Sequence, residues 1–263
     1  MTRLLEIDRL TIRFGGHLAV SNATFGADAG QISGLIGPNG AGKTTTFNAI
    51  CGVIQPSSGR ISFDGKVINR TSTHGRARLG IGRTFQRLEV FGSLTARENV
   101  QVGAEIRRSW ARRRAARPQL LAPDQADLDL GAEVDLILGR LGLDEVADVR
   151  VGQLPTGQAR LVELGRALAA RPSLLLLDEP ASGLDDSESV EFGDLLCELA
   201  EHGLGILLVE HDVALVMRVC NRVSVLDFGQ IIAEGTPEEI RANEAVRSAY
   251  LGAIADTHAG SGS

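Results

Sequence analysis

The octapeptide GPNGAGKT, residues 37–44, has the residue types and spacing of a phosphate-binding loop, G-x-x-x-x-G-K-[ST]. Its glycines carry no Cβ, so the backbone can wrap closely around a phosphate chain and direct successive N–H groups inward. Lys43 adds a point charge toward the β- and γ-phosphates, and the hydroxyl of Thr44 is suited to binding Mg²⁺. We therefore predict that this loop binds a nucleoside triphosphate.

The segments on either side of the loop support that interpretation. Residues 31–36 form a short apolar run of buried-strand length, and residues 44–50 favour a helix that ends near Gly52. A helix N-terminus after the loop adds a favourable dipole for anions. A chance glycine-rich turn is the alternative, and the strand and helix flanks argue against it.

A second apolar run, residues 174–177, ends in two carboxylates, Asp178 and Glu179. Downstream of a phosphate-binding loop this is the Walker B pattern, in which the aspartate holds the Mg²⁺ shell. Glu179, one residue further, is positioned to polarise the attacking water. The alternative is a core strand whose end happens to be acidic, and the preceding loop makes that the weaker interpretation.

The alternation of strand and helix patterns predicts an α/β fold, with a P-loop NTPase core whose mainly parallel sheet carries helices on both faces. An antiparallel β subdomain is expected from two strands within residues 4–25, and Asp64-Gly65 predicts a hairpin turn. The middle third looks helical, with Ser93 or Thr95 capping a helix that ends at Arg108. Further expected elements are helices at 133–143 and 186–202, a strand at 206–209 and a hairpin at 223–234.

Composition limits the classes of function. The 263 residues carry a formal net charge of −6, so no global basic field argues for a nucleic-acid partner. The 3 cysteines are widely spaced, which suits a reducing compartment. Acids near the N-terminus are unlike a signal peptide, and no stretch approaches the ~18 consecutive apolar residues of a membrane span. We expect a soluble, cytosolic protein that can bind to a membrane protein.

From about Leu4 to Leu251 the chain resembles the ATP-binding subunit of ABC transporters. Further motifs occur in the order of that family. They are Phe14, where the family has an aromatic that stacks on adenine, with Val20 nearby; Gln86 of the Q-loop; residues 154–158 of the signature; residues 182–185 of the D-loop; and the switch histidine, His211. The resemblance implies one ABC ATPase domain, residues 4–252, with a helical subdomain inserted at roughly 88–170 and a disordered tail at 253–263.

The resemblance also implies a role for each site residue, with ATP and Mg²⁺ as the bound species. Catalysis would fall to Glu179, His211 and Gln86, and Mg²⁺ binding to Thr44, Gln86 and Asp178. ATP binding would fall to Phe14, Val20, Asn39, Gly40, Ala41, Gly42, Lys43, Thr44 and Thr45, and to Thr156, Gly157 and Gln158 for the ATP held by a second subunit.

Residues 82–86 and 209–212, with the ending at 235–240 and 249–252, resemble most closely the branched-chain amino acid uptake ATPases of bacteria, the LivG-like group. This implies an importer subunit on the cytoplasmic face of the bacterial inner membrane, bound to two transmembrane permease subunits. A second, different ABC ATPase would pair with it head to tail, and a periplasmic or extracellular solute-binding protein would act indirectly. The alternatives are lipopolysaccharide export, urea or amide uptake, and a non-transport ABC ATPase or regulator.

Pro155 departs from the family pattern, because the signature normally has serine there and glycine where Thr156 stands. Proline is acceptable in the first helical turn, since its missing N–H costs little. The serine hydroxyl, however, is lost. We expect the ATP site completed by this signature to be weaker and the partner to be a different subunit.

The sequence allows two interpretations for each of two further segments. The arginines within residues 107–117, around Trp110, either meet anionic lipid or form a solvated helix face. Residues 88–94 either receive the coupling helix of the membrane subunit, as the resemblance implies, or belong to the subdomain core.

Overall fold

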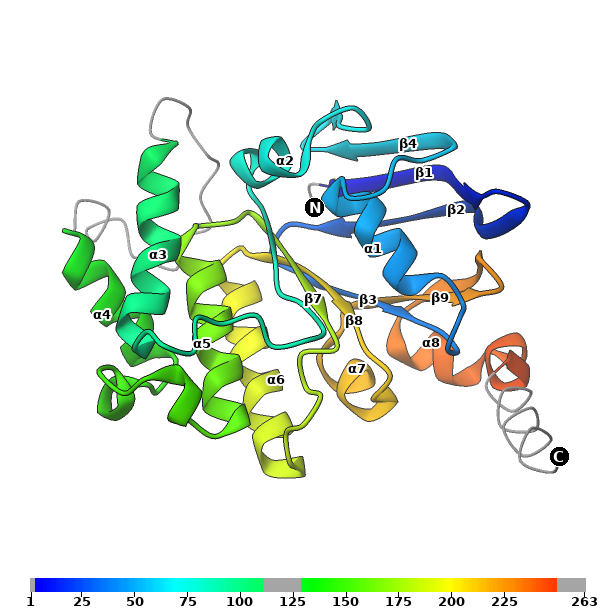
Figure 1. The fold of residues 1–263 in the computed structure, drawn as a ribbon. Coiled ribbons are helices and arrows are strands. Elements are labelled where there is room, and N and C mark those ends of the chain that lie inside the picture. The colour runs from blue at the N-terminus through cyan, green and yellow to red at the C-terminus, as the bar shows by residue number, and fades with distance from the viewer. Residues whose placement is uncertain (1–2, 111–128, 250–263) are drawn as a thin grey trace, which may run out of the picture.

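A computed structural model describes residues 3–110 and 129–249 (Figure 1). The predicted tail at 253–263, the ending at 250–252 and the arginines after residue 110 lie outside the described residues. The described chain forms a four-stranded sheet and a six-stranded sheet, with helices packed around the larger one. No helix in residues 3–110 or 129–249 has both the length and the apolar character that a bilayer span needs.

The four-stranded sheet is antiparallel, in the order β2-β1-β4-β5. It consists of β1 (Arg3–Phe14), β2 (His17–Asp28), β4 (Ser58–Phe63) and β5 (Lys66–Val67). The predicted strands and the turn at Asp64-Gly65 are confirmed, with left-handed φ values of 48° and 71° at the turn. Both N-terminal strands are longer than predicted because their pairing continues to Arg3 with Asp28 at one end and to Phe14 with His17 at the other. A bulge at Arg9, φ 48°, lies within β1 and does not end the pairing.

The six-stranded sheet has the order β10-β9-β3-β8-β7-β6 and is parallel except for β10. Its strands are β3 (Ile32–Ile36), β6 (Ile81–Arg83), β7 (Leu174–Asp178), β8 (Gly205–Val209), β9 (Arg222–Asp227) and β10 (Gln230–Gly235). The three central strands, β3, β7 and β8, are buried along their whole length. The predicted mainly parallel sheet, covered on both faces, is therefore confirmed.

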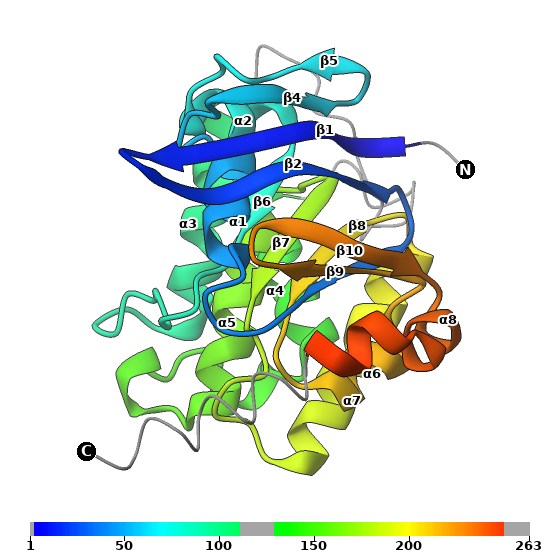
Figure 2. The same cartoon turned by 90° about the vertical axis from the view of Figure 1, so that its right-hand side faces the viewer.

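Alternate residues of the central strands supply two separate cores, because successive side chains of a strand point to opposite faces. Leu174 and Leu176 pack with Phe47 of α1 (Lys43–Cys51) and with the first sheet. Leu175 and Leu177 pack with the helices on the other face, α6 (Asp186–Glu201) and α7 (Val213–Val219). Figures 1 and 2 show α1 between the two sheets. This sandwich fixes the helix that follows the phosphate-binding loop.

The predicted middle helices are α3 (Ala96–Ser109), α4 (Leu130–Arg140) and α5 (Thr156–Ala169), which lie to one side of the sheets (Figure 1). Thr95 rather than Ser93 caps α3, in a capping box with Glu98. The helix predicted at 133–143 begins and ends earlier, because Asp129 caps it and Gly142 adopts φ 65°. The described fold also includes the short helices α2 (Thr73–Leu79) and α8 (Pro237–Ala242), and the 3-10 helices η2 (Asp144–Val146) and η3 (Val151–Gln153).

Arg107 has a different role from either sequence interpretation of the basic stretch. Its guanidinium donates to both carboxylate oxygens of Glu133 at 2.7 and 2.6 Å. Glu133 is 1% exposed and also accepts from Arg171 Nε at 2.9 Å. Because Arg107 is committed to this buried carboxylate, it joins α3 to α4 and is not presented to a lipid surface or to solvent.

Candidate active site

The phosphate-binding loop connects β3 to α1 and depends on glycine for steric reasons. A Cβ at Gly37 would lie 1.9 Å from Leu226 O, and one at Gly42 would lie 2.5 Å from Ala19 O. Gly42 also adopts φ 106°, as the residue that precedes the first turn of α1. The loop is thus pressed against β2 and β9, while Asn39 and Gly40 stand exposed at its tip.

Lys43 is buried, with its ammonium folded into the loop. Its Nζ donates to Gly37 O at 2.7 Å and to Pro38 O at 3.1 Å. Burial lowers the pKa of Lys43, and the nearby carboxylates of Glu179 and Asp178 act in the opposite direction. Thr44 is exposed at the start of α1, beside this charge. The end of the loop therefore places the ammonium group of Lys43 and the exposed hydroxyl of Thr44 on consecutive residues.

Asp178 and Glu179 lie at the carboxyl end of β7, beside the end of β8. Asp178 is 2% exposed, and burial raises the pKa of its carboxyl group, while Arg83 and Lys43 oppose that rise. Glu179 leaves the strand with φ 50°, and its N–H donates to Val209 O at 2.8 Å. A left-handed glutamate is uncommon and indicates a constrained site.

Gln86 and His211 converge on Glu179. The Gln86 side-chain amide donates to Glu179 Oε2 at 2.9 Å, and His211 Nδ1 lies 3.8 Å from the same oxygen. The three side chains come from different segments, after β6, β7 and β8 respectively. The structure thus brings together the residues to which sequence analysis assigned catalysis.

The donor set near Asp178 fits Mg²⁺. The metal prefers oxygen ligands, and Asp178, Gln86 and Thr44 offer a carboxylate, an amide oxygen and a hydroxyl. Arg83 Nη2 lies 3.6 Å from Asp178 Oδ2, which is longer than a hydrogen bond. Arg83 therefore balances the charge of Asp178 without forming a bidentate ion pair with it. The carboxylate oxygens of Asp178 stay available to bind a metal.

Phe14 and Val20 are placed differently with respect to solvent. Phe14, at the end of β1, is 50% exposed and presents its ring to solvent. Val20 has no exposed surface and packs beneath the loop, where its Cγ2 would lie 3.4 Å from a Cβ at Gly42. Phe14 is therefore available for stacking on a base, whereas Val20 supports the loop.

The signature residues Thr156, Gly157 and Gln158 begin α5 and form a second group. Pro155 occupies the cap position and offers no side-chain acceptor to the helix. A Cβ at Gly157 would lie 2.5 Å from Glu188 Oε1, and one at Gly183 of the D-loop would lie 3.5 Å from Thr156 Cγ2. This group thus packs against the D-loop and the first turn of α6.

Two buried charged residues of α5 were missed by sequence reasoning. Arg160 donates to the carbonyl oxygens of Phe85 at 3.3 Å and Gln86 at 3.1 Å. Glu163 accepts from Phe85 N at 3.4 Å and Glu89 N at 3.2 Å, and burial raises the pKa of its carboxyl group. Their positions among the apolar residues of a helix are a signal that could have identified them. Together they hold the Q-loop backbone against the helix that begins with the signature.

Comparison with known families agrees with this geometry. A model described as "ABC transporter" matches residues 20–182, from within β2 to the start of the D-loop. The chain belongs to the ABC transporter family. A second model, described as "Branched-chain amino acid ATP-binding cassette transporter", matches residues 230–256 of this ABC ATPase.

Curated relatives cover nearly all of the ABC ATPase. It is 38% identical to the high-affinity branched-chain amino acid transport ATP-binding protein BraF of Pseudomonas aeruginosa, over 95% of this chain and 98% of the relative. The corresponding LivG protein of Escherichia coli gives the same identity and coverage. The lipopolysaccharide export system ATP-binding protein LptB of Haemophilus influenzae is 34% identical, over 95% of this chain and 97% of the relative.

Solved structures agree with the fold. A nucleotide-free ATP-binding cassette from an ABC transporter superimposes with a TM-score of 0.80 at 26% identity, covering 95% of this chain and 99% of that one. An ATP-binding cassette in its ADP conformation gives a TM-score of 0.80 at 27% identity, covering 96% of this chain and 100% of that one. The ABC ATPase thus has the fold of a nucleotide-binding cassette, as predicted.

Proposed function

We propose that this chain is the ATP-binding and ATP-hydrolysing subunit of a bacterial ABC importer for branched-chain amino acids. The observation that carries the proposal is the convergence of Gln86 and His211 on Glu179, beside the phosphate-binding loop. The match of residues 230–256 to the branched-chain amino acid cassettes supports the solute class. Transport itself would take place in separate permease subunits, so the chain acts as a peripheral subunit at the cytoplasmic face of the inner membrane.

The hydrolytic step follows from the charges on this edge of the sheet. The loop amides and Lys43 neutralise the phosphates of ATP, and bound Mg²⁺, held by Thr44, Gln86 and Asp178, would supply further charge neutralisation. Glu179 orients and deprotonates the attacking water. His211, which lies next to Glu179, stabilises the transferred phosphoryl group.

The separation of the site residues into two groups supports a head-to-tail pair of ATPase subunits. The loop, Asp178 and Glu179 lie at the end of the parallel strands, whereas Thr156, Gly157 and Gln158 pack against the D-loop. A signature directed at the ATP of a second subunit accounts for this arrangement. Since Pro155 lacks the hydroxyl of the usual serine, we propose that the second subunit is a different chain.

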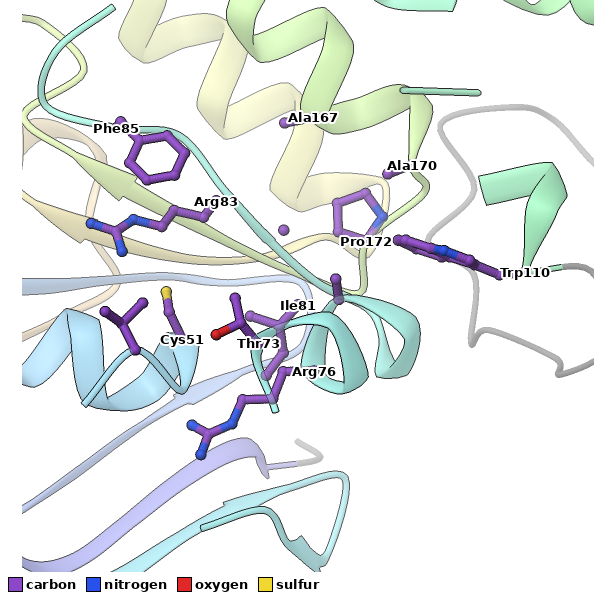
Figure 3. A pocket seen from close by; sticks show the side chains of 13 residues that line it. Cys51, Thr73, Arg76, Ile81, Arg83, Phe85, Trp110, Ala167, Ala170 and Pro172 are labelled. Atoms are coloured by element: carbon purple, nitrogen blue, oxygen red, sulfur yellow. The ribbon is translucent and has the colours of Figure 1, made fainter. Parts of the chain in front are cut away.

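An apolar cavity of about 240 Å³ beside the Q-loop is our candidate for the permease contact (Figure 3). Phe85 and Arg83 line one end of it and Trp110 the other, with exposed Val53 also in its lining. This position supports docking of a cytoplasmic segment of the permease, because that segment would press directly on the residue before Gln86.

Residues 88–94 combine both interpretations offered by the sequence. Leu88 and Val90 pack against the larger core, so they belong to the fold. Phe91 is 47% exposed beneath the guanidinium of Arg166, whose carbon lies 5.2 Å from the ring centroid. We therefore limit the proposed permease contact in this segment to Phe91.

Purification of the tagged chain from membranes, combined with uptake of labelled leucine by the cells, tests the proposal. We expect two permeases and a second ATPase to co-purify, and leucine uptake to require an intact Glu179. Recovery of lipopolysaccharide-export proteins would replace the solute assignment. Recovery of ribosomes or repair proteins without a permease would reject the transport role.

A further inference from the structure

Glu210 is a buried carboxylate between two loops of the active site, and neither the Walker nor the switch motif assigns it a role. It follows β8 directly and is 1% exposed. Its Oε1 accepts from the Ala181 N–H at 2.9 Å, and its Oε2 accepts from the His211 N–H at 3.1 Å. One side chain thus accepts hydrogen bonds from the backbone of the segment after Glu179 and from the backbone of His211.

The Ala181 contact reaches the segment that holds Glu179. Ala181 is the second residue after Glu179, and the next residue, Ser182, donates its N–H to Glu179 O at 3.1 Å. Any displacement of Ala181 therefore moves the turn in which Glu179 adopts its left-handed φ of 50°. Glu210 is in this way linked to the position of the carboxylate that activates water.

The second contact reaches the switch histidine. Besides accepting the His211 N–H, Glu210 Oε2 lies 3.6 Å from His211 Nδ1, and Glu179 Oε2 lies 3.8 Å from the same nitrogen. Two carboxylates therefore lie near one edge of the imidazole, at distances longer than a hydrogen bond. His211 itself is 63% exposed, so Glu210 holds this residue through its backbone N–H rather than through its ring.

The opposite side of the same turn is held by Arg160. Its Nη2 donates to Ser182 O at 3.3 Å and to Gln86 O at 3.1 Å. Ala181 and Ser182 are thus held between a carboxylate from the β8 end and a guanidinium from α5. Arg160 ties the D-loop to the Q-loop, while Glu210 ties the residue before the D-loop, Ala181, to the switch histidine.

We propose that Glu210 is a positioning residue for ATP hydrolysis, which holds the turn after Glu179 and the backbone of His211 as one unit. Burying an ionisable carboxylate is costly unless its acceptors are filled, and here backbone N–H groups fill them. The inference rests on the proposed roles of Glu179 and His211. It predicts that loss of Glu210 affects the hydrolytic step more than ATP binding.

The test uses the full chain with Glu210→Ala, Glu210→Gln and the matched control Glu133→Gln. Glu133 is an equally buried glutamate, 1% exposed, whose partners Arg107 and Arg171 lie in and beside the helical region. We expect Glu210→Ala to lower kcat about 10- to 100-fold while the Kd for ATP changes less than about twofold. Glu210→Gln should keep more activity, because its side-chain oxygen can still accept from Ala181. Glu133→Gln should lower the Tm but not kcat.

Two readouts separate positioning from simple destabilisation. In the ¹⁵N NMR spectrum of the imidazoles, the His211 ring signals should change in Glu210→Ala, because the backbone that carries the ring is released, and stay unchanged in Glu133→Gln. In a His211→Ala background, Glu210→Ala should lower kcat by less than a further factor of about three. The reason is that the effects of substituting residues that act as a unit are not additive. Unchanged His211 signals, or full additivity, would overturn the proposal.

If the proposed function is wrong, the turnover and NMR measurements give a different pattern. If Glu179→Gln retained turnover, the assignment of the water-activating carboxylate would be wrong. The NMR comparison of Glu210→Ala with Glu133→Gln would still decide whether Glu210 orients His211.

Discussion

The side-chain amide of Gln86 donates to Glu179 Oε2 at 2.9 Å, across 93 residues of sequence. The bond joins the loop after β6 to the carboxylate after β7, on neighbouring parallel strands. Gln86 also follows Phe85, which lines the cavity proposed for the permease. A movement of the proposed permease segment would therefore reach the carboxylate of Glu179 through two consecutive residues, Phe85 and Gln86.

Glu179→Gln should keep ATP binding and lose at least about 100-fold in kcat, because the amide cannot accept the proton of the attacking water. ATP hydrolysis and ATP affinity, measured on the same preparation, check this. Glu191→Gln, an exposed substitution on α6, is the matched control and should leave both unchanged. Substantial residual turnover in Glu179→Gln would count against its role.

Pro155→Ser should raise ATP turnover in the assembled transporter by up to about tenfold, the equivalent of one hydrogen bond to a charged phosphate. Serine is also a preferred helix cap, so α5 should not lose stability. Turnover by the reconstituted complex is the measurement. No change on substitution would mean that the missing hydroxyl does not limit this site.

Arg76→Met should destabilise the protein by about 3 kcal/mol or more, because several buried carbonyls would lose their donor. Arg76 is 1% exposed, and its Nη1 donates to Ala49 O at 2.6 Å and Ile50 O at 2.7 Å, at the end of α1. Urea denaturation measures the change. The exposed Arg78→Met on the same helix is the control, and equal losses in both variants would contradict the prediction.

Glu163 should make folding less favourable as the pH rises. Burial raises its folded-state pKa above the ordinary value of 4.5. Its contribution to stability is therefore fully present below pH 4.5, and it is lost as the pH rises through the folded-state pKa. Glu163→Gln keeps an oxygen for the N–H groups of Phe85 and Glu89 but cannot ionise.

Denaturation of Glu163→Gln and the parent chain across this pH range isolates the effect from those of Asp178 and Glu210, whose pKa values are also raised. We expect the free energy of unfolding of the parent, relative to the variant, to fall with rising pH. A constant difference would show that Glu163 does not titrate as the contacts imply.

Val53→Glu should reduce solute uptake without changing ATP affinity, since it places a charge in the proposed docking cavity, where Val53 is 61% exposed. Trp110, the 1 tryptophan of the chain, lines the same cavity and reports on it by fluorescence. Docking of a permease peptide should change that fluorescence in the parent chain and not in the variant. Val190→Glu, an exposed site on α6, is the control.

Local features of this protein were predictable because their causes are local. Apolar runs at residues 31–36 and 174–177 identified strands that lie in the central sheet, and the glycine spacing identified the loop between β3 and α1. Caps such as Thr95 with Glu98 likewise involve residues only three apart. Boundaries were less accurate where strand pairing continued past the apolar pattern, as at Arg3 and Asp28, or where a cap was not recognised, as at Asp129.

The buried charges were not predictable for a different reason. Arg76, Arg160, Glu163 and Glu210 look like ordinary polar residues in the chain, and their partners lie up to 78 residues away. Whether such a side chain is solvated or buried depends on which backbone groups the packed elements leave unpaired. The role of Arg107 in the basic stretch was not predictable for the same reason, because it depends on where the folded chain places Glu133.

The sequence by itself determined the nucleotide-binding loop, the acidic strand end, the α/β fold class and the family, because these depend on consecutive residues and short periodicities. The tertiary structure alone decided that Gln86 and His211 meet at Glu179, that Val20 lies beneath the loop, and that Glu210 joins the turn after Glu179 to the switch histidine. These relationships arise where the carboxyl ends of parallel strands meet, and the order of those strands is set by packing rather than by any segment of the chain.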